Sequence, residues 1–139
     1  MTILILNGPN LNRLGVRQPE IYGTKTMAQI LLEIQRNHPD LQLQYRQSNH
    51  EGDLIDYIQD FEGDGIVLNA GGYSHTSVAL RDAVVDCDKP VVEVHISDTT
   101  RREAFRKVDL LVDVCARTII GHGIDGYKEA VDFLIARPH

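Results

Sequence analysis

The residues of this chain best suited to acid–base chemistry begin with a cation and a phenol in one loop. Arg17 and Tyr22 lie five residues apart, downstream of the apolar run Ile3–Leu6. A free tyrosine has a pKa of about 10, and a guanidinium within about 4–6 Å favours the ionised phenolate. The spacing therefore predicts that Arg17 holds Tyr22 as a tyrosinate base. The alternative is structural: Tyr22 packs its ring and Arg17 is a solvated surface residue.

A second candidate is an imidazole with a carboxylate beside it. His95 lies in the apolar run 91–96, and Glu93 stands two residues earlier, on the same face of a strand. A carboxylate in that place can orient or charge an imidazole, as a general acid requires. Asn69, which ends an earlier apolar run, could also exchange a hydrogen bond with that imidazole. A satisfied histidine in the core is the alternative.

Three further polar groups could recognise a ligand. Asn10 follows the first apolar run and is either an amide donor to a developing oxyanion or a turn residue. The segment Asn69–His75 contains two glycines, which allow either a close approach to a ligand or a sharp turn. The third group is basic and comprises Arg101, Arg102 and Arg106. Guanidinium groups suit carboxylates and hydroxyls, although a solvated helix face would carry the same residues.

These side chains need a scaffold, and the apolar pattern predicts one. Short β-branched and leucine-rich runs alternate with helical patterns, which indicates parallel βαβ units. The predicted strands cover residues 3–6, 41–45, 65–68 and 91–96, and the predicted helices cover 27–37, 53–61, 77–85, 100–107 and 127–136. A fifth strand lies either at 110–114 or at 118–120. The pattern favours an α/β fold, a flavodoxin-like three-layer sandwich with a five-stranded parallel sheet.

The predicted topology brings the candidate residues together. Polar clusters follow the first, third and fourth strands, and the carboxyl ends of parallel strands share one edge of the sheet. We therefore expect these clusters to converge on one crevice.

Composition bounds the remaining possibilities. A chain of 139 residues is expected to form one domain, residues 1–139. Its net charge of −6 argues against nonspecific binding of nucleic acid. No apolar run approaches the roughly 20 residues of a membrane span, and the first residues lack the basic region of a signal peptide, so we expect a cytoplasmic protein. The histidines show no metal-ligand spacing, and the lone GxGxxG match at 121–126 lacks the sequence context of a dinucleotide site.

The chain resembles the type II 3-dehydroquinate dehydratases over nearly its whole length. The resemblance rests on several separate segments, which are residues 7–12, 17–23, 47–52, 69–82 and 93–97. It implies a flavodoxin-like fold, no cofactor, no metal, and assembly into a homo-oligomer, a dodecamer built from trimers. The implied reaction is the anti-elimination of water from 3-dehydroquinate to give 3-dehydroshikimate, in aromatic amino acid biosynthesis or in quinate breakdown.

The resemblance also implies the role of each catalytic side chain. Tyr22 is the base that removes the C2 proton, and Arg17 keeps it ionised. Asn10 holds a water that stabilises the enolate. His95 protonates the leaving C1 hydroxyl, and Glu93 and Asn69 orient it.

The same resemblance implies the substrate contacts. The backbone N–H groups of Ile96 and Ser97 hold the substrate carboxylate, and three side chains hold ring hydroxyls, namely those of Asn69, His75 and Arg106. Asp82 reaches in from a neighbouring subunit. The loop that carries Arg17 and Tyr22 acts as a lid.

A non-catalytic flavodoxin-like module is the alternative from another class. A phosphoryl receiver needs an aspartate at the end of the third strand, where this chain has Asn69. A flavin site needs a hydroxyl- and glycine-rich loop after the first strand, where this chain has asparagine and proline.

Overall fold

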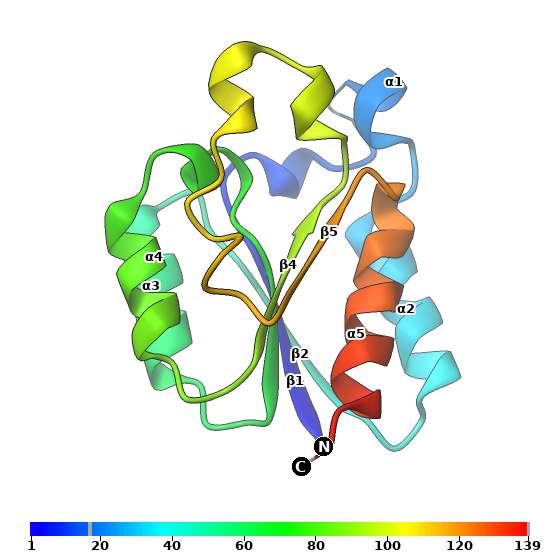
Figure 1. Ribbon diagram of the computed structural model, residues 1–139. Helices are drawn as coiled ribbons and strands as arrows, with labels where there is room; N and C mark the ends of the chain where they lie inside the picture. The colour runs from blue at the N-terminus through cyan, green and yellow to red at the C-terminus, as the bar shows by residue number, and fades with distance from the viewer. Residues whose placement is uncertain (17, 139) are drawn as a thin grey trace.

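The fold is a parallel sheet between two layers of helices, as the sequence predicts (Figure 1). The structure, a computed structural model, describes residues 1–16 and 18–138, without the side chains of Pro19 and Tyr22. Five strands lie in the order β2-β1-β3-β4-β5, and all four pairings are parallel. The strands are β1 Thr2–Asn7, β2 Gln42–Gln47, β3 Gly65–Asn69, β4 Val91–His95 and β5 Arg117–Ile120. This topology confirms the predicted α/β, flavodoxin-like fold.

The burial of each strand follows its place in the sheet. Every residue of β3 and β4 is buried, whereas the edge strand β2 alternates between exposed and half-buried residues. A strand covered by helices on both faces is apolar throughout, and an edge strand can keep polar side chains in water. The central strands therefore supply the rigid end from which Asn69 and His95 project.

The helices pack in two pairs, one on each face. The pairs are formed by α2 Met27–Asn37, α3 Glu51–Asp60, α4 Val78–Asp86 and α5 Gly126–Ala136, and the short helix α1, Pro19–Tyr22, belongs to neither pair. The helices α2 and α5 cover one face, and α3 and α4 cover the other (Figure 1). Two of them begin at residues with N-cap side chains: Thr26 and Gln29 form a capping box before α2, and Ser77 Oγ accepts from the Leu80 N–H.

The predicted helix at 100–107 is wrong. Two short 3-10 turns take its place, η3 at Thr99–Arg101 and η4 at Ala104–Lys107. The carboxylate of Asp98 accepts from the backbone N–H of Thr100, and Arg102 is extended, with φ −101° and ψ −156°. A local side-chain bond of this kind competes with helix formation. The chain therefore turns here instead of continuing as a helix.

The fifth strand lies at the second of its two predicted positions. Residues 117–120 pair with β4, and residues 110–114 form turns that pack on α4. Arg81 of α4 donates to the carbonyl oxygen of Leu110 at 2.8 Å and pairs with Asp113 at 2.5 Å. The segment 110–114 is apolar, as a strand would be, because it packs Leu111 fully into the core and not because it pairs in the sheet.

Within the described residues, none of the helices combines the length and apolar character that crossing a membrane requires.

Candidate active site

A cavity of about 150 Å³ opens at the carboxyl edge of β1, β3 and β4. Its lining comes from the ends of these strands and from the turns that follow them: Pro9, Asn10, Leu11, Asn69, Gly71, Gly72, His75, His95, Ile96, Ser97, Thr99, Arg102 and Arg106. The three polar clusters that the sequence places after the first, third and fourth strands therefore meet in one cavity.

The loops after β1 and β3 meet because a glycine lets their backbones touch. The Gly8 N–H donates to the Asn69 carbonyl oxygen at 2.7 Å, and a Cβ on Gly8 would lie 2.5 Å from the carbonyl oxygen of Ala70. A larger residue would push the loops apart. Asn10 follows in the left-handed region, with φ 69°, and its backbone N–H donates to Asn49 Oδ1 at 3.0 Å. This turn holds Asn10 at the rim of the cavity.

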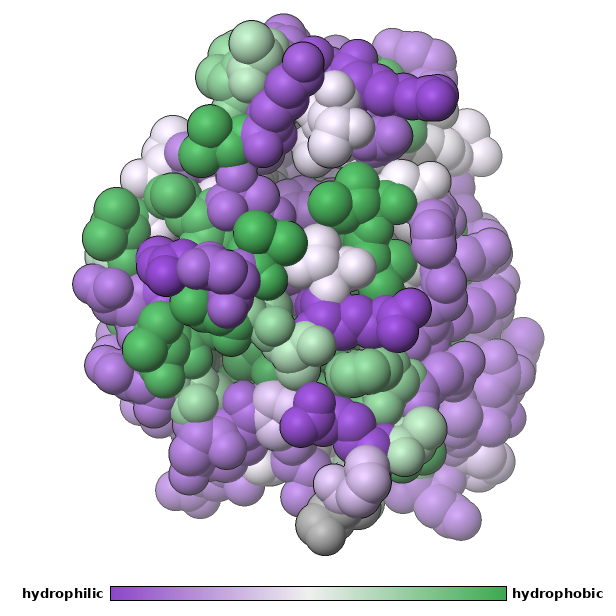
Figure 2. Space-filling view, in the orientation of Figure 1, coloured by the Kyte–Doolittle hydropathy of each residue, from purple (hydrophilic) through white to green (hydrophobic). Residues whose placement is uncertain are grey.

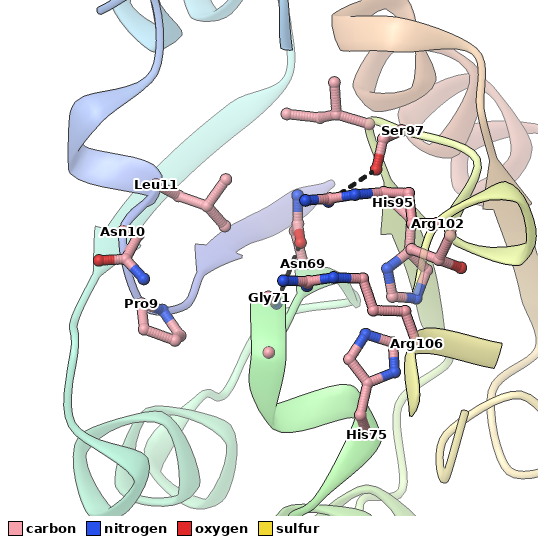
Figure 3. Close-up of a pocket in the computed structure, with 13 residues that line it drawn as sticks. Pro9, Asn10, Leu11, Asn69, Gly71, His75, His95, Ser97, Arg102 and Arg106 are labelled. Atoms are coloured by element: carbon pink, nitrogen blue, oxygen red, sulfur yellow. Dashed lines mark hydrogen bonds between the residues drawn. The ribbon is translucent and has the colours of Figure 1, made fainter. Parts of the chain in front are cut away.

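The walls of the cavity differ in chemistry (Figure 3). Arg102 and Arg106 extend side by side toward Asn69 from one wall. The imidazole rings of His75 and His95 lie below them, stacked with their centroids 6.3 Å apart. Asn10 stands with Pro9 and Leu11 on the opposite wall. A small polar anion or a polyol would meet cations on one side and an amide on the other.

His95 and Glu93 form the buried ion pair that their spacing predicts. His95 Nε2 lies 2.7 Å from Glu93 Oε2, and the two side chains are 5% and 0% exposed. The hydroxyl of Thr118 on β5 donates to the other carboxylate oxygen, Oε1, at 3.0 Å. Glu93 is therefore fixed at both oxygens and orients the imidazole through Nε2.

Sequence reasoning missed a second carboxylate at the same nitrogen. Asp109 Oδ2 lies 3.3 Å from His95 Nε2, and the side chain is only 13% exposed. Its signal in the sequence was an acidic residue between Val108 and the apolar residues 110–112. An acidic group in such a run must find a partner when it is buried. Without the position of the segment, that partner could not be named.

The two carboxylates change the charge of the site. Burial alone would lower the pKa of His95, but the hydrogen bonds and charges of Asp109 and Glu93 raise it to about 9. Burial raises the pKa of Glu93 to about 6, which the bond to His95 partly opposes. For Asp109, burial acts to raise the pKa, but the nearby His95 imidazole and the hydrogen bond from the Leu111 N–H lower it. At neutral pH the imidazole is protonated, which is the form a general acid needs.

The same three side chains carry atoms that can ligate a metal ion. Within the described residues, Glu93, His95 and Asp109 form a group whose ligand atoms all lie within 4.8 Å of one another. The separation of 2.7 Å between Nε2 and Oε2 is that of a hydrogen bond with a proton between the two atoms. The arrangement therefore suits proton transfer.

Asn69 lies in the cavity wall but does not orient His95 as expected. Its Nδ2 donates to Tyr127 Oη at 2.9 Å, and its Oδ1 accepts from the Gly71 N–H at 3.2 Å. Tyr127 is fully buried, and its hydroxyl donates onward to Asn7 Oδ1 at 2.7 Å. The amide of Asn69 is thus held by a buried bridge from α5 to the ends of β1 and β3, away from the imidazole.

Removing the hydroxyl of this bridge is expected to destabilise the protein. In Tyr127→Phe, Asn69 Nδ2 and Asn7 Oδ1 lose a buried partner, which costs about 1–3 kcal/mol of unfolding free energy. Urea unfolding followed by circular dichroism measures the loss. Tyr73→Phe is the control, because the Tyr73 hydroxyl donates to an exposed carbonyl oxygen of Asn49. Equal losses in the two variants would contradict a special role for the bridge.

The other candidate residues fall into three groups. His75 and Arg106 line the cavity: His75 Nδ1 donates to the Val108 carbonyl oxygen, and Arg106 Nε donates to Glu103 at 2.6 Å. Asp82 is exposed on α4 and does not line the cavity. Arg17 and the side chain of Tyr22 lie outside the described residues. The backbone of Tyr22 ends the short helix α1.

Comparison with known proteins agrees with this geometry. The sequence profile described as dehydroquinase class II matches residues 1–135. The chain belongs to the class II dehydroquinase family. The crystal structure of a type II dehydroquinase from Butyrivibrio crossotus superposes with a TM-score of 0.93 at 41% identity, and the match covers 98% of each chain.

The sequence relatives of this chain are named as 3-dehydroquinate dehydratases or as catabolic 3-dehydroquinases. A 3-dehydroquinate dehydratase of an Exiguobacterium species is 49% identical over 97% of this chain and 94% of its own length. A catabolic 3-dehydroquinase of Pyricularia oryzae is 45% identical, over 98% of this chain and 90% of its own length. Proteins named for the reaction alone and a protein named as catabolic therefore both occur among the relatives of this chain.

Proposed function

We propose that this protein dehydrates 3-dehydroquinate to 3-dehydroshikimate, as a hydro-lyase of the class II dehydroquinase family. One observation carries the proposal within the cavity: the imidazole of His95 lies 2.7 Å from the buried carboxylate of Glu93 at the carboxyl edge of the sheet. This pairing favours the protonated imidazole, because the neighbouring carboxylates raise the pKa of His95. Loss of water from a β-hydroxy ketone requires an acid for the leaving hydroxyl and a base for the neighbouring C–H bond. His95 supplies the acid.

The base in this proposal is Tyr22, assisted by Arg17. The phenolate takes the C2 proton, which lies next to the ketone, and the guanidinium keeps the phenol ionised. The electron pair moves to the ketone oxygen as an enolate. A water held by Asn10 stabilises that oxygen. The loop that carries Arg17 and Tyr22 closes over the substrate and excludes bulk water.

The second half of the reaction takes place at His95, across the cavity from Asn10. The enolate re-forms its carbonyl, the C1–oxygen bond breaks, and His95 delivers a proton so that hydroxide leaves as water. Because Glu93 occupies Nε2, the proton delivered to substrate comes from Nδ1. Tyr22 then holds a proton and His95 has lost one, so one proton transfer through solvent resets the site. The overall change is substrate to product plus water.

The remaining lining residues position the substrate. The backbone N–H groups of Ile96 and Ser97 receive its carboxylate, while Asn69, His75 and Arg106 receive its hydroxyls. The cationic wall supports this assignment because the chain has a net charge of −6 and must hold an anion by local cations. Arg102 adds to that wall and donates to Ser97 Oγ at 3.4 Å.

We further propose that the chain acts as one catalytic domain, residues 1–139, in a cytoplasmic dodecamer of trimers. Asp82 would serve the cavity of a neighbouring subunit. Its position on the exposed side of α4 supports this role. Apolar side chains gather over α4 and the segment before β5 (Figure 2), and the exposed ones are Val78, Val85, Phe105, Val108 and Val112. A surface of this kind favours association with another protein surface.

The direct test is turnover of 3-dehydroquinate by the purified protein in the presence of a chelator. Dehydration conjugates the new C1–C2 double bond with the ketone, and the ultraviolet absorbance of this enone should rise with time at neutral pH. Heat-denatured protein is the control. No rise in absorbance with native protein would refute the proposed function.

Two other readings make different predictions. A covalent imine would need a lysine at the substrate, and none of the lining residues in the described part of the chain is a lysine. Borohydride added with substrate should therefore leave the activity intact. A non-catalytic flavodoxin-like module would bind flavin or accept a phosphoryl group and leave 3-dehydroquinate unchanged.

A further inference from the structure

Asp109 has a geometry that the proposed reaction does not explain. Its Oδ1 accepts from the Leu111 N–H at 2.9 Å, which fixes the carboxylate at the start of the 110–114 segment. Its Oδ2 is buried and has no hydrogen-bond partner among the residues that the structure describes, yet it lies 3.3 Å from His95 Nε2. A buried carboxylate oxygen without a hydrogen bond is costly. The neighbouring imidazole of His95 compensates this cost when it carries a proton.

Asp109 cannot act on His95 as Glu93 does. Nε2 carries a single hydrogen, and Glu93 Oε2 is the closer acceptor, at 2.7 Å against 3.3 Å. Glu93 therefore receives the hydrogen bond, and Asp109 contributes its negative charge. Both carboxylates lie beside the same nitrogen, Nε2, which leaves Nδ1 to carry the proton that the substrate receives.

Charges of both signs face the imidazole from other elements. Arg102 and Arg106 line the same cavity, and their positive charge opposes protonation of His95. The ring of His75 stacks on the His95 imidazole. On the other side Cys115 lies close to Glu93 and Asp109, and burial together with these carboxylates raises the pKa of its thiol, so it stays neutral. Glu93 is itself fully buried, and burial raises its pKa to about 6. The charge of Asp109 therefore adds to that of Glu93 in favouring the protonated imidazole, against the positive charge of Arg102 and Arg106.

We propose that Asp109 is a positioning residue for the acid step: its carboxylate, together with Glu93, holds His95 as an imidazolium with Nδ1 directed to the substrate. This inference rests on the proposed function for its catalytic consequence, but its effect on His95 exists without substrate. Asp109 does not line the cavity among the described residues, so it acts through His95 and not through substrate contact.

The test compares Asp109→Asn with a matched variant of the same segment. Asparagine keeps the size and the oxygen that accepts from Leu111 but removes the charge. Asp113→Asn is the control, because Asp113 lies four residues on, is 63% exposed and pairs with Arg81. Two quantities are measured for each: the titration of His95 by nitrogen chemical shifts in histidine-labelled protein, and the pH profile of kcat and KM. The spectrum of His95→Gln assigns the signal among the six histidines.

The sign of the expected effect follows from the charge removed. Loss of a negative charge weakens proton binding, so the proton affinity of His95 should fall at least roughly tenfold in Asp109→Asn. The alkaline limb of the kcat profile should move to lower pH by about one unit, which corresponds to the tenfold change in proton affinity. KM should change less than about threefold. The deficit in kcat should then be small near pH 6 and grow as the pH rises. Asp109→Glu should recover part of the loss.

Two results would overturn the inference. In one, the His95 titration in Asp109→Asn matches that of the unsubstituted protein; in the other, Asp113→Asn shifts it equally. If Asp109→Asn does not fold, Asp109→Ser decides by the same measurements. The titration needs no turnover, so it separates this inference from the proposed function, which fails only if the unsubstituted protein does not convert 3-dehydroquinate.

Discussion

Tyr22→Phe is expected to lower kcat by roughly 10²–10⁴-fold, the contribution of a positioned general base. Phenylalanine keeps the ring and removes the oxygen that takes the C2 proton. Substrate binding should survive, because the contacts proposed for the carboxylate and hydroxyls come from β3, β4 and the turns that follow them. The absorbance assay gives kcat, and calorimetric titration with 3-dehydroquinate gives the affinity.

A second tyrosine provides the control for this change. Tyr57 lies on α3, away from the cavity lining, and Tyr57→Phe should retain its turnover. Activity of Tyr22→Phe within tenfold of the unsubstituted protein would remove Tyr22 from the role of base. A loss of binding as large as the loss of kcat would instead make Tyr22 a substrate contact.

His95→Gln should produce a different defect of similar size. Glutamine can still donate to Glu93, so the buried carboxylate keeps a partner, but it cannot deliver a proton to the leaving hydroxyl. Dehydration should slow by roughly 10²–10⁴-fold. Removal of the C2 proton by Tyr22 should continue, because the enolate forms before the hydroxyl leaves. In deuterated water the variant should therefore exchange the C2 hydrogen faster than it forms product.

The exchange experiment separates the two roles. Tyr22→Phe should slow both exchange and dehydration, whereas His95→Gln should slow only dehydration. His122→Gln is the control, because His122 also sits 2.7 Å from a carboxylate, Glu129, but is 55% exposed. If His95→Gln stopped exchange as completely as Tyr22→Phe, the division into one base and one acid would be wrong.

The fold was largely predictable because its signals are local. Apolar runs bounded by turn residues give the strands and the four longer helices, and a parallel sheet then brings the strand ends to one edge. The short helix at 100–107 was mispredicted because its composition suits a helix while the Asp98 side chain stabilises a turn. The segment 110–114 looked like a strand because burial of Leu111 and pairing in a sheet leave the same apolar signature.

The site was predictable where partners lie close in sequence. Glu93 and His95 are two residues apart on one strand, so their contact follows from the period of a strand. Asp109 and His95 are joined by tertiary packing of an irregular segment, which no local pattern encodes. Asn69 was assigned to the imidazole because both end neighbouring strands, but Tyr127, from α5, competes for the amide and binds it.

The hydroxyl of Tyr127 gives this fold an all-or-none character. It belongs to the last helix, and it joins that helix to Asn7 at the end of the first strand and to Asn69 at the end of the third. One wall of the cavity is therefore complete only when α5 has docked on the sheet. A chain that has formed its first four strands but not this contact would have an incompletely fixed wall. Catalytic activity should consequently appear late in refolding, together with the burial of Tyr127.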